Sequence, residues 1–143
     1  MPTTQSTLRV LEASLSGKKR PENLAAGGLQ HVLLDTVVYV GGETTNAAVE
    51  LATSIPIGAR IDLAASSINN AAISGVSAKV TTLAADGTTA VNLFAAASIA
   101  AAGAKPFSAN GGTVTMLDSR LYLTLTAGTV SANDTVYVRI VYY

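Results

Sequence analysis

Cysteine and tryptophan are absent from this chain of 143 residues, and charged residues are scarce. Without cysteine, disulfide bonds and thiolate metal sites are excluded. Charged residues make up 13% of the chain, about half the usual share of roughly 25%. Between Leu63 and Leu117 the only charged side chains are Lys79, Asp86 and Lys105. Because the surface of a free soluble protein is about a quarter to a third charged, we expect much of this surface to contact other protein.

The formal net charge is zero, with nine basic and nine acidic residues. Proteins that bind nucleic acids gain much of their affinity from Lys and Arg on phosphates, so this balance argues against such a partner. Met1 to Ser16 contains no apolar signal core. The longest apolar stretch with little charge, Leu93 to Ala104, is too short to span a bilayer. We therefore expect neither a nucleic-acid nor a membrane partner.

The length fits a single domain preceded by a segment of different composition. Residues 1–28 hold six of the 18 charged residues, among them Arg9, and Gly and Pro bracket the basic run Lys18, Lys19 and Arg20. The run is typical of a solvated loop, and the partial alternation before it fits either an edge strand or an arm that docks on a neighbour. The predicted division is an N-terminal arm, 1–28, and a β-sandwich domain, 29–143.

Short alternating segments separated by turn residues run through the second part of the chain. Arg120 to Thr126 alternates leucines with polar residues and tyrosine, and Thr135 to Tyr143 is β-branched and aromatic. Asp86-Gly87 is a hairpin signal. Seven to nine such strands, with turn signals about every 8–12 residues, predict an all-β fold: an antiparallel β-sandwich, of which the jelly-roll is one version, with an extended N-terminal arm.

One segment does not fit this pattern. Ala95 to Gly112 has a single charge and little bulk, and Gly103 and Pro106 would break a helix there. We expect a long loop, and long loops inside compact domains are usually functional. Lys105 and Phe107 from this segment join Arg9, Lys18, Lys19 and Arg20 as candidate partner-binding residues.

No arrangement of residues points to catalysis. His31 is the only histidine and lies in the apolar run LQHVLLDTVVYV, so we interpret it as a partly buried structural residue. One histidine without cysteine does not make a typical zinc site. Asp35 follows four residues later, but no nucleophile motif accompanies the pair. We expect no catalytic, metal or cofactor-binding residues, no cofactor and no small-molecule substrate, although the fold could still bring two distant carboxylates together as in a glycosidase.

Roughly residues 58–143 of the chain resemble small virion proteins of tailed bacteriophages. The resemblance rests on Asn110 to Thr115, Ser119 to Val130 and Val136 to Tyr143, together with the alanine-rich Ala95 to Gly103. Several proteins of this type are capsid decoration, or cement, proteins, which clamp neighbouring major capsid subunits on the outer face of the shell. Others belong to tails or fibres.

The resemblance implies a structural protein of the virion that binds the major capsid protein and works as a homo-oligomer, a trimer or a dimer. The expected location is the outer capsid surface. Two alternatives stay open: a receptor- or glycan-binding module of a tail or fibre, and an enzyme whose activity would depend on Asp35 or His31. The absence of tryptophan weighs against the glycan-binding alternative.

Overall fold

A computed structural model describes residues 4, 6, 30–51 and 55–143 of the chain. These residues form ten β-strands and no helix, and thus no helix long and apolar enough to cross a membrane. The strands are β1 (His31–Val38), β2 (Ala48–Glu50), β3 (Arg60–Asp62), β4 (Ser67–Asn70), β5 (Ser77–Leu83), β6 (Ala90–Ser98), β7 (Gly103–Pro106), β8 (Thr113–Thr115), β9 (Leu121–Ala127) and β10 (Thr135–Tyr142). The prediction of an all-β antiparallel fold is confirmed.

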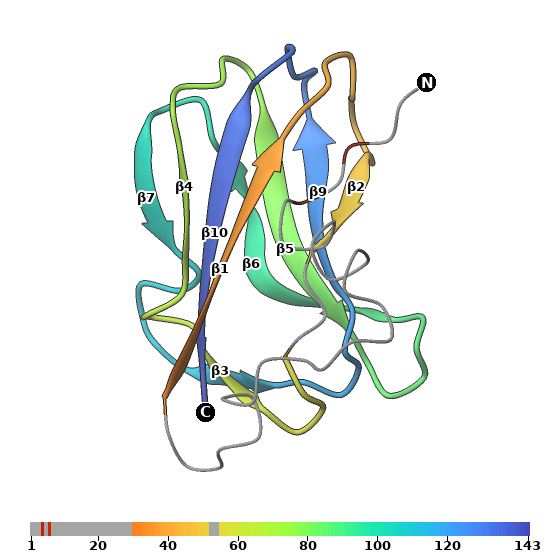
Figure 1. Ribbon diagram of the computed structural model, residues 1–143, viewed down its shortest axis with the longest axis vertical. Helices are drawn as coiled ribbons and strands as arrows, with labels where there is room; N and C mark the ends of the chain where they lie inside the picture. Colours follow the sequence, from red (N-terminus) through yellow and green to blue (C-terminus); the bar gives the residue numbers. More distant parts are fainter. Residues whose placement is uncertain (1–3, 5, 7–29, 52–54) are drawn as a thin grey trace, which may run out of the picture.

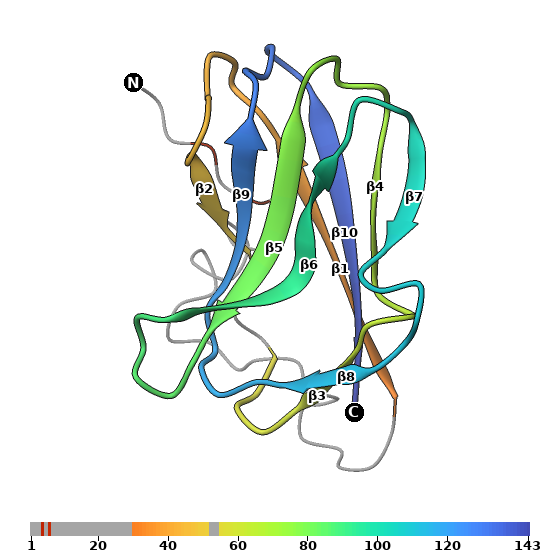
Figure 2. The same ribbon diagram turned by 180° about the vertical axis from the view of Figure 1, so that it is seen from behind.

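The strands build two antiparallel sheets that pack as a sandwich (Figure 1). Sheet A contains β1, β10, β3, β4, β7 and β8, and sheet B has the order β2-β9-β5-β6. Figure 2 shows the sandwich from behind, with sheet B in front of β1 and β10.

Alternation along the strands separates the core from the surface. Leu121, Leu123 and Leu125 of β9 are fully buried, whereas the residues between them are partly exposed. On β10, Val138 and Ile140 point inward in the same way. A strand from each of the two sheets therefore has the period-2 pattern of burial that is typical of a sheet packed on one side only.

In sheet A, two long strands are each interrupted and so appear as pairs of short strands, β3 with β4 and β7 with β8. β3 and β4 pair with the same edge of β10, through Ile61 opposite Tyr142 and Ser67 opposite Arg139. Six residue steps separate Ile61 from Ser67, against three between Arg139 and Tyr142, so the β3–β4 strand carries three extra residues. β7 and β8 pair with β4 and β3 in the same order. Counting β3 with β4 and β7 with β8 reduces the ten strands to eight.

The eight strands pair in a nested pattern. β1 pairs with β10, β2 with β9, β3–β4 with β7–β8, and β5 with β6. Each pair lies inside the previous one along the sequence, as in a long hairpin. Contacts of β10 with β3 and β4, and of β9 with β5, then join the nested pairs into two sheets.

The segment expected to be a long loop, Ala95 to Gly112, contains more strand than predicted. β6 continues to Ser98, and β7 occupies Gly103–Pro106. Alanine has a low intrinsic strand preference, but the ladder to β5 and the pairing with β4 decide the conformation here. Only short connections remain as loops.

Most of the predicted N-terminal arm lies outside the described residues; Thr4 and Ser6 are described. Ser6 is fully buried and bridges Val37 at the edge of β1. The Thr4 hydroxyl donates to the Glu43 carboxylate and accepts a hydrogen bond from the Val40 N–H at 3.3 Å. These two residues therefore contact the sandwich of their own chain at the end of β1.

Candidate functional site: the outer face of sheet A

The outer face of sheet A is unusually apolar where β1 and β10 run together. On β1, Leu33, Asp35 and Val37 are buried, whereas Val32 and Leu34 are exposed. On β10 the outward side chains include Tyr137. The sequence LQHVLLDTVV thus places apolar side chains on both faces of one strand, and only one of these faces belongs to the core.

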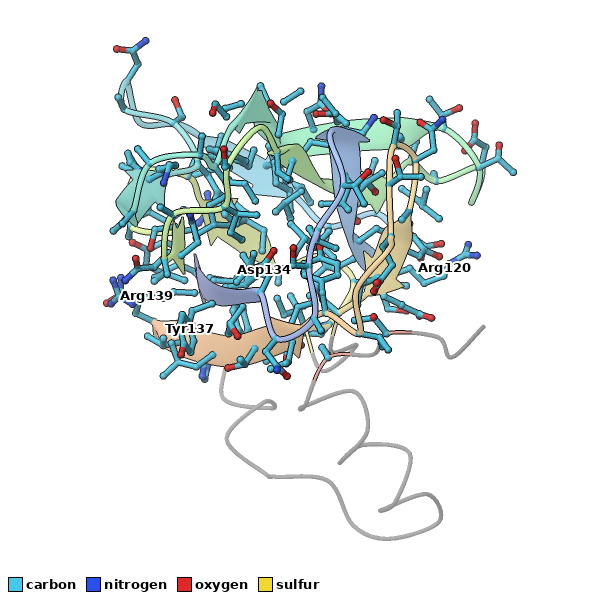
Figure 3. All side chains as sticks on the ribbon, turned by 90° about the horizontal axis from the view of Figure 1, so that it is seen from above. Arg120, Asp134, Tyr137 and Arg139 are labelled. Atoms are coloured by element: carbon cyan, nitrogen blue, oxygen red, sulfur yellow. The ribbon has the colours of Figure 1, made fainter. Side chains whose placement is uncertain are left out.

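The strand register arranges the outward residues in two rows across four strands. One row runs Leu34, Arg139, Ser67, Pro106, and the next runs Thr36, Tyr137, Asn69, Ala104. Neighbouring strands are about 4.8 Å apart, and rows two residues apart are separated by about 6.6 Å. Figure 3 shows Tyr137 and Arg139 side by side on this side of the molecule. Arg139 and Tyr137 therefore occupy the middle of the face.

A hollow of about 340 Å³ lies over these two rows. Tyr137 is 53% exposed and Leu34 67% exposed, so both offer apolar surface to an incoming partner. Arg139 reaches sideways and donates from Nη1 to the backbone carbonyl of Ala65 at 3.2 Å. A guanidinium has five N–H donors, so this bond leaves most of the donor capacity of Arg139 for other groups.

Apolar side chains also flank the hollow along β1. Eight large hydrophobic residues are exposed among the described residues, and five of them lie on this face: Val32, Leu34, Val38, Val40 and Tyr137. We call the outward side of β1, its continuation to Val40, and β10 the β1–β10 face. A cluster of exposed apolar residues of this kind typically marks a protein contact surface.

Of the candidate partner-binding residues named from the sequence, the structure describes only Lys105 and Phe107, and neither is among the exposed apolar residues of the β1–β10 face. Arg9, Lys18, Lys19 and Arg20 are outside the described residues. Lys105 is on β7, and its Nζ donates to Asn70 Oδ1 at 3.0 Å and to the carbonyls of Ala101 at 2.8 Å and Gly103 at 3.1 Å. This ammonium group thus holds the turn between β6 and β7.

Phe107 follows β7 and is 6% exposed, with its ring centroid 6.0 Å from that of Phe94. Its ring belongs to the hydrophobic core, where it joins the two sheets. Contact of Lys105 or Phe107 with a partner stays a prediction. The sequence could not assign these roles because one charged and one aromatic residue in an alanine-rich segment fit a surface site equally well.

His31 and Asp35 are on the same side of β1 but not within reach of each other. Four residues of strand correspond to about 13 Å, well beyond hydrogen-bond distance. The His31 ring stacks on Tyr142, with centroids 5.2 Å apart. Asp35 is buried, and its Oδ1 accepts from the Thr36 N–H at 2.8 Å. The two residues therefore do not form a catalytic dyad with each other.

Sequence reasoning missed Leu34, Tyr137 and Arg139 as surface residues that lie together. The run from residue 29 to 40 was identified as apolar, but a continuous apolar strand is equally typical of a strand buried on both faces. Only the structure shows that β1 pairs with β10 and that Val32 and Leu34 are exposed, so that no second layer formed by the described residues covers this face.

Among residues 4, 6, 30–51 and 55–143, no group of three or more His, Cys, Asp or Glu side chains could hold a metal ion. Comparison of the chain with protein-family models, with curated proteins and with solved structures finds no match.

Proposed function

We propose that this protein is a structural protein of a tailed phage that decorates and stabilises the capsid by binding major capsid subunits. The observation that carries the proposal is the β1–β10 face, which has five exposed apolar side chains, two of which, Leu34 and Tyr137, line a hollow. The scarcity of charge and the resemblance of roughly residues 58–143 to phage virion proteins support the same function. The location would be the outer surface of the capsid.

The energetics of such a contact fit an adhesive role. Full burial of one Leu, Val or aromatic side chain contributes about 1.5–3 kcal/mol. Association itself costs at least about 4 kcal/mol in lost freedom of motion, so five partly exposed side chains give only a modest affinity for one contact. Copies that are linked to each other bind a repeating surface much more tightly than one copy does, because each further contact is intramolecular. We therefore propose that the protein acts as a homo-oligomer, a trimer or a dimer.

We further propose the jelly-roll as the arrangement of this sandwich. The support is the nested pairing, in which the first strand pairs with the last and each following pair lies inside it. A jelly-roll consists of eight strands in two sheets and is common in viral capsid proteins. The eight strands of this sandwich, with β3–β4 and β7–β8 counted as one each, have that number and distribution.

The proposal is tested by incubating the purified protein with undecorated phage shells and sedimenting the shells. We expect the wild type to sediment with shells and Leu34→Glu to remain in the supernatant, because a carboxylate would have to be buried at the contact. Leu34 is 67% exposed, so the fold should tolerate the change. Lys79→Glu on sheet B is the matched control and should sediment like the wild type. Equal sedimentation of the wild type and Leu34→Glu would refute a role for this face.

A further inference from the structure

The sequence contains one Asn-Gly pair, Asn110-Gly111, and the structure places it in the connection between β7 and β8. Ala109 and Asn110 are the exposed central residues of a turn that runs from Ser108 to Gly111. The Gly111 N–H closes this turn by donating to the Ser108 carbonyl at 3.3 Å, which is long for a hydrogen bond. Figure 2 shows the connection at the side of the sandwich, between the labels of β7 and β8. The Asn110 side chain is therefore open to water, and its turn is weakly closed.

The other described asparagines differ from Asn110 because the residue that follows each of them carries a side chain. They are Asn46, Asn69, Asn70, Asn92 and Asn133. Asn70 is also buried, and its amide group is fixed by a hydrogen bond to the Ile99 carbonyl at 2.8 Å.

Asn46 is the closest match to Asn110. It is exposed and occupies the same position in a turn, which the Ala47 N–H closes by donating to the Thr44 carbonyl at 2.9 Å. The two sites differ in the residue that follows, alanine at one and glycine at the other, and in the length of the closing hydrogen bond. Asn46 is thus a built-in control for the chemistry of Asn110.

We propose that Asn110 is a site of spontaneous deamidation. The backbone nitrogen of Gly111 attacks Cγ of Asn110, and the bond from Cγ to the side-chain nitrogen breaks. That nitrogen leaves as ammonia and takes the proton of the Gly111 N–H, which leaves a succinimide ring. Water then opens the ring, at Cγ to give aspartate or at the backbone carbonyl carbon to give isoaspartate. One water is consumed and one ammonia released, with no oxidation or reduction.

Glycine after asparagine favours the first step. Because glycine has no Cβ, nothing hinders the approach of its nitrogen to Cγ, and its backbone adopts the necessary conformations at little cost. Asparagine is accordingly among the residues that limit the lifetime of proteins at high temperature. The modification needs no partner and is independent of capsid decoration.

Both products add a carboxylate to a nearly neutral part of the chain. The segment from Leu63 to Leu117 has three charged side chains, and the new carboxylate would be the fourth. Its ordinary pKa is far below neutral pH, so it is ionised there. The formal net charge of the protein, zero before the reaction, falls by one.

Isoaspartate also changes the backbone. Its main chain runs through Cβ and Cγ, which adds one atom between positions 110 and 111. Leu63 holds the connection on both sides, since its carbonyl accepts from the Ser108 N–H and its N–H donates to the Gly112 carbonyl, both at 3.0 Å. β8 begins directly afterwards, at Thr113. We therefore expect isoaspartate to loosen the pairing of β8 with β3, whereas aspartate leaves it intact.

The proposal is tested by incubating the full-length protein at mildly alkaline pH, which promotes loss of the Gly111 N–H proton, and by tandem mass spectrometry of its peptides. We expect a mass increase of about 1 Da at Asn110, where a carboxyl group replaces an amide, and none at Asn46 over the same period. Gly111→Ala should convert at least about tenfold more slowly, equivalent to about 1.4 kcal/mol of activation free energy. A Cβ at position 111 would meet no atom within 4 Å, and Asn110→Gln, which should show no increase, avoids the positive φ of +78° there.

Three outcomes would overturn the proposal. They are no conversion at Asn110 in the folded protein, equal rates at Asn110 and Asn46, and an unchanged rate in Gly111→Ala. Conversion only in urea-unfolded protein belongs to the first outcome, because it would show that the turn protects the pair. Because shells are absent from the incubation, its failure would leave the decoration proposal standing, and the reverse also holds.

Discussion

Ser66 is the residue that joins the interrupted β3–β4 strand to β10. Its side chain is fully buried, and its Oγ accepts from the backbone N–H of Val141 at 2.9 Å. The three extra residues between β3 and β4 shift the backbone of this strand out of register at that point. A side-chain oxygen thus takes the place of a carbonyl in the ladder.

Ser66→Ala should therefore destabilise the fold by about 1–3 kcal/mol, because it leaves the buried N–H of Val141 without an acceptor. Urea unfolding monitored by circular dichroism measures the change. Ser67→Ala, one residue along and only partly buried, should stay within about 0.5 kcal/mol of the wild type. Equal stability of both variants would contradict the assigned role of Ser66.

Asp118 carries a marked pKa shift at the residue scale. Hydrogen bonds from the side chain and backbone N–H of Arg120 lower the pKa of the Asp118 carboxyl from its ordinary value of 3.8 to about 2, and the charge of Arg120 adds to this. Since the folded-state pKa is the lower one, the stabilisation is complete above pH 3.8 and is lost as the pH falls toward 2. Asp118→Asn should therefore remove part of the acid sensitivity of folding in this range.

Carbon NMR titration of the Asp118 carboxyl measures this shift directly. We expect a midpoint near 2 in the wild type and a midpoint closer to 3.8 in Arg120→Gln. Arg139→Gln on the other sheet should leave the titration unchanged. A wild-type midpoint at the ordinary value would show that the Asp118–Arg120 pair does not persist in solution.

At the scale of the elements, the turn after β9 depends on a close approach of two loops. Gly128 has φ +81°, and a Cβ at this position would lie 2.3 Å from the carbonyl oxygen of Gly75 in the β4–β5 loop. Gly42 has a similar φ of +86°, but a Cβ there would meet no atom within 4 Å. A substitution at Gly42 therefore causes backbone strain alone, whereas a substitution at Gly128 causes backbone strain and a steric clash.

Gly128→Ala should lower the melting temperature clearly more than Gly42→Ala does. In the Gly42 variant, the left-handed backbone conformation of an alanine costs about 1 kcal/mol of folding free energy. In the Gly128 variant, the new Cβ must in addition displace the backbone of the β4–β5 loop. Differential scanning calorimetry of both variants compares them. A similar loss in both would mean that the two loops separate easily.

The sequence was most informative where one face of a strand is buried. Arg120 to Thr126 and Thr135 to Tyr143 were predicted as strands and are β9 and β10 within one or two residues. The Asp86-Gly87 hairpin was also correct, since β5 and β6 flank it. The strand character of Ala95 to Ser98 and of β7 was missed, because alanine and glycine have no strand preference of their own and follow their neighbours.

At the scale of the whole molecule, the sequence predicted an adhesive surface but not its location. The scarcity of charged residues is a property of the composition, and composition does not show which part of the surface a partner would contact. The β1–β10 face exists because β1 is at an edge of sheet A and pairs with the last strand of the chain, a contact between segments about a hundred residues apart. Leu34, Tyr137 and Arg139 meet only through this pairing, so no local pattern could show them together.

We propose above all that this protein covers the outer surface of a phage shell. The most direct measurement is the number of copies per major capsid subunit, determined by quantitative mass spectrometry of purified virions. We predict a fixed ratio that reflects the symmetry of the shell, with the copies lost when Leu34→Glu replaces the wild type. Virions that lack the protein, or that carry only the few copies expected of a tail or fibre component, would contradict the claim.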